Sequence, residues 1–95
     1  MITIDNIRKC VVQVVPEYNI KKVSLFGSYA NGTATEDSDI DLLVEFISRP
    51  VSIYKIAGVK LSLEDIIGKE VDVVALPIPP NSLIEVDKEV LLYEQ

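Results

Sequence analysis

Residues 23–46 read VSLFGSYANGTATEDSDIDLLVEF: an apolar run, a Gly-Ser turn, a polar connection and a second apolar run that carries acids. Gly27 ends the first run, and its conformational freedom suits a turn that another group, such as a phosphate, approaches closely. Asp39 and Asp41 lie one residue apart at the start of the second run. Because side chains alternate across a strand, both carboxylates should point to the same face. Such a pair favours a divalent cation.

The spacing of apolar residues predicts the elements around this stretch. Helices are expected over about residues 4–15 and 53–67, with a short helical turn over about 82–86. Strands are expected over residues 21–26, 40–46 and 71–76, and residues 90–93 are expected as a brief strand or an extended packing segment. The fold class is therefore mixed α/β (α+β): a small mixed sheet of three to four strands, covered by two main helices.

The ends of these elements carry their own signals. Thr3 or Asp5 can cap the first helix, and Pro16 should kink or stop it before the following loop. Gly68 is a natural stop for the second helix. As a cap, Ser28 would start a short helix whose free N–H groups attract anions.

Length and composition limit the function. The 95 residues suffice for one domain, residues 1–95, and leave little room to build an acceptor pocket. No apolar run approaches the roughly 20 residues that span a bilayer, which predicts no membrane association. The N-terminus lacks the basic and apolar regions of a signal peptide, so a cytoplasmic location is expected.

The chain has no histidine and one cysteine, Cys10, which excludes Ser-His-Asp triads, Cys-His dyads and the usual zinc sites. Carboxylates remain as bases and metal ligands, and they suit Mg²⁺ or Mn²⁺. The net charge of −6, with scattered basic residues, argues against a broad nucleic-acid surface. A small nucleotide or a basic protein partner fits this charge better.

Asp72 is a third candidate site residue. It interrupts an apolar strand, where a carboxylate is costly unless it is paired or ligated, although it could also lie exposed at a sheet edge. Taken alone, a Gly-Ser turn and an Asp-x-Asp pair are common structural features. Together they supply a phosphate cradle and cation ligands, which nucleotidyl transfer requires.

Leu-Phe-Gly-Ser, ten residues, Asp-Ile-Asp and a later Val-Asp-Val resemble the nucleotidyltransferase fold of the DNA polymerase beta superfamily, and within it the minimal nucleotidyltransferases. The resemblance implies that Gly27 and Ser28 hold the β- and γ-phosphates of a nucleoside triphosphate. It implies that Asp39 and Asp41 bind two Mg²⁺ ions, with Mn²⁺ as an alternative. Asp72 would be the third carboxylate, a ligand of one ion that helps to activate the attacking hydroxyl.

The resemblance also implies an activity and a partner. The enzyme would be adenylyltransferase-like and would move NMP, most simply AMP from ATP, to a hydroxyl acceptor. Minimal nucleotidyltransferases commonly pair with a helical HEPN toxin, an RNase, and act as its antitoxin by modifying a tyrosine. One departure is Asn31, where many relatives carry Arg. Lys21, Lys22, Lys55 or Lys60 could supply the missing cation.

Two other interpretations stay open. The chain could be a non-catalytic antitoxin or binding module with a vestigial nucleotide site, which Asn31 favours. It could instead modify a small molecule, as the related aminoglycoside nucleotidyltransferases do. Tyr29 could stack on a base or pack against the first helix. The apolar residues from Val90 to Tyr93 could pair sheet edges in a homodimer or pack in the core.

Overall fold

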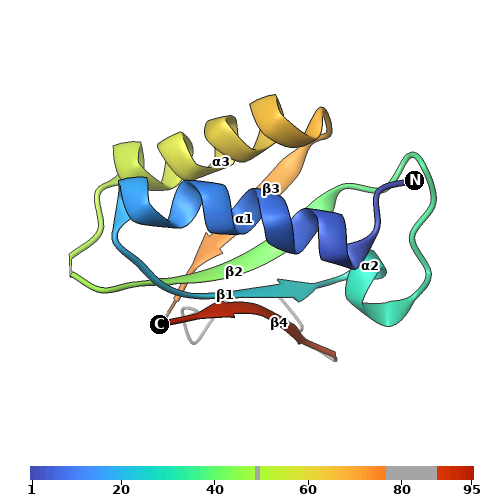
Figure 1. Ribbon diagram of the computed structural model, residues 1–95, viewed down its shortest axis with the longest axis horizontal. Coiled ribbons are helices and arrows are strands. Elements are labelled where there is room, and N and C mark those ends of the chain that lie inside the picture. Colours follow the sequence, from blue (N-terminus) through green and yellow to red (C-terminus); the bar gives the residue numbers. More distant parts are fainter. Residues whose placement is uncertain (49, 77–87) are drawn as a thin grey trace.

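The computed structural model describes residues 1–48, 50–76 and 88–95 and places three helices and four strands in them (Figure 1). In chain order these are α1 (Ile4–Tyr18), β1 (Ile20–Phe26), α2 (Ser28–Asn31), β2 (Ile40–Phe46), α3 (Ile53–Ile67), β3 (Val71–Ala75) and β4 (Val90–Glu94). The mixed α+β class and the two main helices are confirmed. The turn predicted over residues 82–86 lies outside the described residues.

The four strands form one mixed sheet in the order β3-β2-β1-β4. β1 runs antiparallel to both β2 and β4, whereas β2 and β3 are parallel. A parallel pair needs a long crossover, and α3 supplies it. Figure 1 shows α1 and α3 side by side on the same face of the sheet. The core therefore lies between this helical layer and the sheet.

The alternation of β2 determines which face is buried. Ile40, Leu42 and Val44 are fully buried against the helices, while on the other face Asp41 and Glu45 stay partly exposed and Leu43 between them is buried. The helices contribute apolar residues at helical spacing, including Ile7, Val11, Val59 and Leu63. The apolar spacing that predicted these helices is thus the spacing of their buried residues, although Ile66 of α3 is 43% exposed.

The first helix ends later than predicted. Thr3 is its N-cap and accepts a hydrogen bond from the Asn6 amide at 3.1 Å, but Pro16 does not stop it. The helix continues to Tyr18 and ends at Asn19, whose φ of 51° is left-handed. Pro16 removes one hydrogen bond, the one to the carbonyl of exposed Val12, where water can replace it. Gly68, with φ 78°, ends α3 as predicted.

The two edge strands differ from the central pair. In β3 only Val71 is fully buried. Asp72 therefore does not interrupt a buried run; it is exposed at the sheet edge, which was the alternative that the sequence left open. β4 confirms the strand predicted over residues 90–93. Whether this edge pairs with a second copy stays a prediction.

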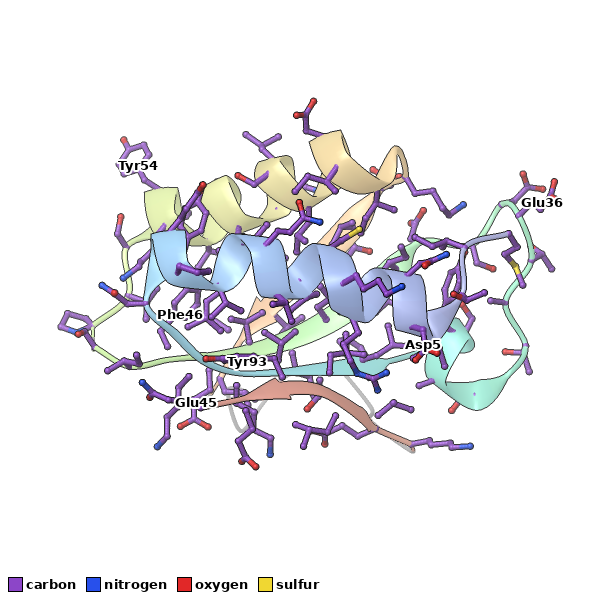
Figure 2. All side chains as sticks on the ribbon, viewed as in Figure 1. Asp5, Glu36, Glu45, Phe46, Tyr54 and Tyr93 are labelled. Atoms are coloured by element: carbon purple, nitrogen blue, oxygen red, sulfur yellow. The ribbon has the colours of Figure 1, made fainter. Side chains whose placement is uncertain are left out.

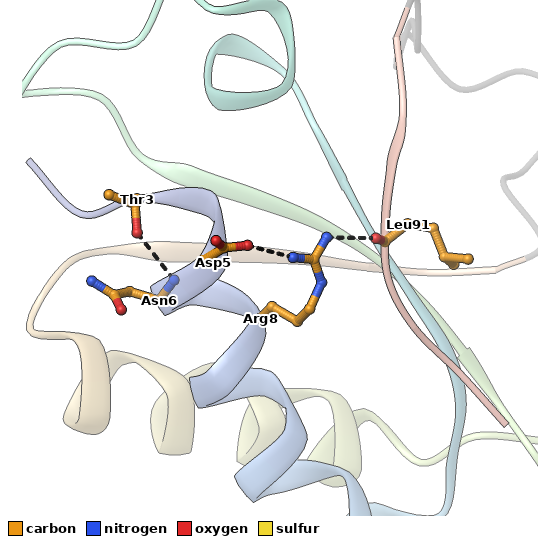
Figure 3. Close-up of polar contacts among 5 residues, drawn as sticks. All are labelled: Thr3, Asp5, Asn6, Arg8 and Leu91. Atoms are coloured by element: carbon orange, nitrogen blue, oxygen red, sulfur yellow. Dashed lines mark hydrogen bonds and ion pairs between the residues drawn. The ribbon is translucent and has the colours of Figure 1, made fainter.

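Arg8 joins the N-terminal helix to the C-terminal strand (Figure 3). Its Nη1 pairs with Asp5 Oδ1 at 2.7 Å, and its Nη2 donates to the Leu91 carbonyl of β4 at 3.3 Å. Figure 2 shows the contrast between Phe46, which lies beneath the helices, and Tyr54, which projects from α3 and is 86% exposed. Among the described segments, no helix is long and apolar enough to cross a membrane.

Gly58 of α3 lies against Tyr18 of α1. A Cβ there would lie 2.8 Å from Tyr18 Cε1, and the Tyr18 hydroxyl is 2.9 Å from Ser62 Oγ. The missing side chain of Gly58 therefore makes room for the Tyr18 ring.

Gly58→Ala should lower the stability of the protein by about 1 kcal/mol, because the steric cost exceeds the gain in helix propensity. In a Tyr18→Ala background the same change should instead stabilise the protein by about 0.5–1 kcal/mol, since only the propensity gain remains. A Tyr18→Phe background keeps the ring and should keep the destabilisation. Urea unfolding measures all three, and a destabilisation of equal size in the Tyr18→Ala background would contradict the steric cause.

Candidate active site

Strand register brings the predicted site residues together in one line across the sheet. Phe26, the last residue of β1, pairs with Asp41 of β2, and Asp41 pairs with Asp72 of β3. Gly27 directly follows Phe26, so the turn begins beside Asp41. These ends lie at the side of the molecule where α2 and the polar loop are found, on the right in Figure 1. The turn and two of the three predicted carboxylates therefore share one place.

The turn requires glycine for two independent reasons. Gly27 has φ 74° and ψ −152°, a conformation open to glycine and strained for other residues. A Cβ on Gly27 would also collide with Oδ2 of Asp41. The prediction that Ser28 caps the short helix was wrong. Gly27 is the N-cap, without a side-chain hydrogen bond, and Ser28 is the first residue of α2.

The carboxylates of Asp41 and Asp72 interact directly. Burial raises the pKa of Asp41 to about 6, and its hydrogen bond and charge repulsion with Asp72, followed by the charge of Asp39, act in the same direction. A bound cation would reduce the repulsion between two carboxylates held this close together. Hard carboxylate oxygens are also the ligands that Mg²⁺ prefers. The donor set therefore fits a divalent metal ion.

Asp39 affects the Asp41 carboxyl less than Asp72 does. It is exposed, just before β2, and is the weakest contributor to the raised pKa of Asp41. Within residues 1–48, 50–76 and 88–95, no three acidic, cysteine or histidine side chains form a ready group of metal ligands. The structure thus brings Asp41 and Asp72 together and leaves Asp39 at the border of the site.

The loop before Asp39 is held by contacts that sequence reasoning missed. Ser38 Oγ accepts a hydrogen bond from the Thr35 amide at 2.9 Å, and the Ser38 amide donates to the Thr35 carbonyl at 3.1 Å. Lys69 Nζ donates to the Glu36 carbonyl at 2.6 Å. Thr and Ser near a turn are a readable signal, but the link to Lys69 spans 33 residues and only the fold reveals it.

The lysines suggested as substitutes for the missing Arg make their contacts away from the turn. Lys21 pairs with Glu45 at 3.4 Å, and Lys22 lies in register with Glu45 and Glu94, toward the opposite end of β1. Lys55 lies 5.6 Å from the centre of the Phe46 ring.

Lys60 and Tyr29 are both held by contacts within the protein. Lys60 bonds to Glu64 and to the backbone of β3. Tyr29 is 6% exposed and belongs to the core cluster that contains Ile7, so it packs rather than offering a stacking face.

The chain is similar to known nucleotidyltransferases in sequence and in fold. The model of the nucleotidyltransferase domain family matches residues 4–93. A protein of Methanocaldococcus jannaschii, named as a candidate protein adenylyltransferase, is 36% identical over 91 residues, covering 96% of this chain and 92% of that protein. A solved structure described as a candidate minimal nucleotidyltransferase is 34% identical with a TM-score of 0.68, covering 83% of this chain and 84% of that one.

A more distant likeness concerns the fold alone. It is to a chain in the complex of the tri-AMPylated Shewanella oneidensis HEPN toxin with its MNT antitoxin, at 16% identity and a TM-score of 0.72, covering 98% of this chain and 74% of that one. The fold and the matches define a nucleotidyl-transferring enzyme. The chain belongs to the nucleotidyltransferase domain family, and within it to the minimal nucleotidyltransferases.

Gly27→Ala should weaken Mn²⁺ binding by about tenfold, a loss typical of disturbed metal-ligand geometry, because the new Cβ displaces Asp41. Gly32→Ala is the matched control. Gly32 also has a positive φ, 78°, but nothing lies within 4 Å of its added Cβ, so it should lose stability and keep its metal affinity. Titration followed by electron paramagnetic resonance measures both. Equal affinity losses in the two variants would implicate backbone strain instead of the contact with Asp41.

Asp41→Asn should stabilise the metal-free protein at neutral pH. In the folded protein the pKa of Asp41 is about 6, above the ordinary value of 3.8. The charged Asp41 therefore lowers the free energy of unfolding. This loss is absent below about pH 4, grows up to about pH 6 and is constant above it. After allowance for solvent screening, we expect a gain of about 1 kcal/mol at about pH 7.5 and none at about pH 3.5. Urea unfolding in EDTA measures this, with exposed Asp37→Asn as the control. A gain that persists in acid would exclude charge as its cause.

Proposed function

We propose that this chain transfers AMP from ATP to a hydroxyl group of another protein and releases pyrophosphate. The observation that carries the proposal is the register that places the Gly27 turn beside Asp41 and Asp72. The name of the M. jannaschii relative, a protein adenylyltransferase, supports AMP as the transferred group. The family supplies the reaction class, and the site supplies the residues.

The triphosphate would bind at the turn. The first N–H groups of a helix have no partner within the helix, so those of α2 can donate to phosphate oxygens, joined by the Ser28 hydroxyl. Gly27 lets the phosphates approach the backbone closely because it carries no side chain. This part of the site binds and orients the β- and γ-phosphates.

The carboxylates would hold two Mg²⁺ ions, with Asp39 and Asp41 binding both and Asp72 binding one. Bound there, the ions would neutralise charge on the attacking and leaving oxygens of an in-line displacement. Asp41 is partly buried, which fixes its orientation, whereas exposed Asp39 can adjust to a bound nucleotide.

The transfer step follows from these positions. The acceptor oxygen forms a bond to the α-phosphorus while the bond from that phosphorus to the β-phosphate oxygen breaks, and pyrophosphate leaves. Asp72 is exposed beside the site, so its carboxylate can accept the proton of the acceptor hydroxyl.

The acceptor we propose is a tyrosine of a helical HEPN-type toxin, which would make this chain an antitoxin. The structural likeness to the chain from the AMPylated HEPN toxin complex supports the choice of partner. The exposed positions of Asp39 and Asp72 also leave the site open to a protein side chain. The charge of −6 favours a partner with a basic surface.

The test is to incubate the chain with ATP labelled at the α-phosphate, Mg²⁺ and a purified HEPN-type toxin. We expect label on a tyrosine of the toxin, and a loss of at least a hundredfold in Asp41→Asn, since a metal ligand is removed. Asp37→Asn, with an exposed carboxyl in the neighbouring loop, is the matched control and should label normally. If the wild type binds Mn²⁺ and yet no label is transferred from ATP to the toxin in any reaction, protein AMPylation is refuted.

A second function is favoured by Asn31, which is exposed at the end of α2, at the position where the resemblance to minimal nucleotidyltransferases implies an Arg. The chain could neutralise its partner by forming a complex, without catalysis. The double variant Asp39→Asn with Asp41→Asn separates the two functions. If it still neutralises the partner as the wild type does, complex formation is the working function. If neutralisation is lost while the complex persists, catalysis is.

A further inference from the structure

Two side chains one turn apart on α3 hold the first residue of β3. Glu64 Oε2 accepts a hydrogen bond from the Val71 amide at 3.0 Å, and Lys60 Nζ donates to the Val71 carbonyl at 2.7 Å. The same two side chains bond to each other, Nζ to Oε2, at 2.9 Å. Three linked contacts therefore fix both polar groups of one residue.

These contacts replace a missing strand. Among the strands that the structure describes, β3 is an edge strand and pairs with β2 alone. In a parallel ladder alternate residues face the neighbouring strand, and Glu70, whose carbonyl accepts from Ile40 at 3.1 Å, faces β2. Val71 therefore presents its N–H and C=O to the open side. Lys60 and Glu64 satisfy those groups, which would otherwise bond to water or to another chain.

We propose that Lys60 and Glu64 are positioning residues for Asp72, the exposed carboxylate of the active site. The Val71 carbonyl belongs to the peptide that joins Val71 to Asp72, so the Lys60 hydrogen bond fixes the plane from which Asp72 projects. The Val71 side chain is fully buried, which anchors the other face of the strand. Asp72 is thereby held at the register position opposite Asp41.

The charges of the pair agree with this role. The hydrogen bond to Glu64 is the main cause of the raised pKa of Lys60, and the Asp72 carboxylate contributes to the increase. Lys60 thus keeps its proton, and with it the donor that Val71 needs. The pair also accounts for Lys60 not serving the triphosphate: its ammonium is already engaged at β3.

The inference rests on the proposed metal site, and Mn²⁺ affinity tests it without any transfer reaction. Lys60→Met and Glu64→Leu should each weaken Mn²⁺ binding about tenfold, as expected when a ligand loses its support. Glu64→Gln retains an acceptor for the Val71 amide, and Lys60→Arg retains a donor, so both should recover most of the affinity. Lys55→Met and Asp65→Asn, on the same helix, should bind as the wild type does.

A merely structural role is distinguished by repeating Lys60→Met in an Asp72→Asn background. If Lys60 acts through Asp72, the second change should cost less than twofold there. An undiminished tenfold loss would overturn the inference. So would wild-type Mn²⁺ affinity in both Lys60→Met and Glu64→Leu.

The transfer assay separates this inference from the proposed function. If the wild type AMPylates its partner and Lys60→Met matches it in Mn²⁺ affinity, kcat and KM, the inference fails and the function stands. If Lys60→Met weakens Mn²⁺ binding only when Asp72 is present, yet no form of the chain transfers AMP, the inference stands and the function fails.

Discussion

The structure depends on the pairing of β2 with β1 on one side and with β3 on the other. β2 is the strand whose one face is fully buried beneath α1 and α3, so its register cannot slip by a residue without turning Asp41 into the core. The packing of Ile40, Leu42 and Val44 therefore fixes where Asp41 points. Through the same pairing it also fixes what Asp41 meets: the Gly27 turn from β1 and Asp72 from β3.

This coupling explains why the candidate site was largely predictable. The apolar alternation of residues 40–46 defined both the strand and the face of its acids, and Gly27 followed from its place at the end of an apolar run. What the sequence did not contain was the relation between separate strands. Sequence could show that Asp72 interrupts an apolar run, but only the parallel pairing places it opposite Asp41 and at an exposed edge.

The errors have specific physical causes. Pro16 does not stop α1, because a proline in the last turn loses one hydrogen bond, and packing of the surrounding helix can offset that loss. Ser28 was expected as a cap because serine favours that position, but the glycine before it takes the position with a backbone that serine would find strained. In both cases tertiary structure outweighed a local preference. Neither error changed the predicted order of helices and strands.

A site at a sheet edge is open to other molecules, but the backbone of its edge strand has hydrogen-bond partners on one side only. In the proposed reaction an acceptor reaches Asp72, and among the described residues no further strand pairs with β3 on its open side, so the backbone there lacks a neighbouring strand. Side chains from α3 can supply the missing bonds without closing the site, because they come from the helical face while Asp72 points to the opposite one. The crossover that makes β2 and β3 parallel brings α3 to this position. The connection that creates the site thus also provides its support.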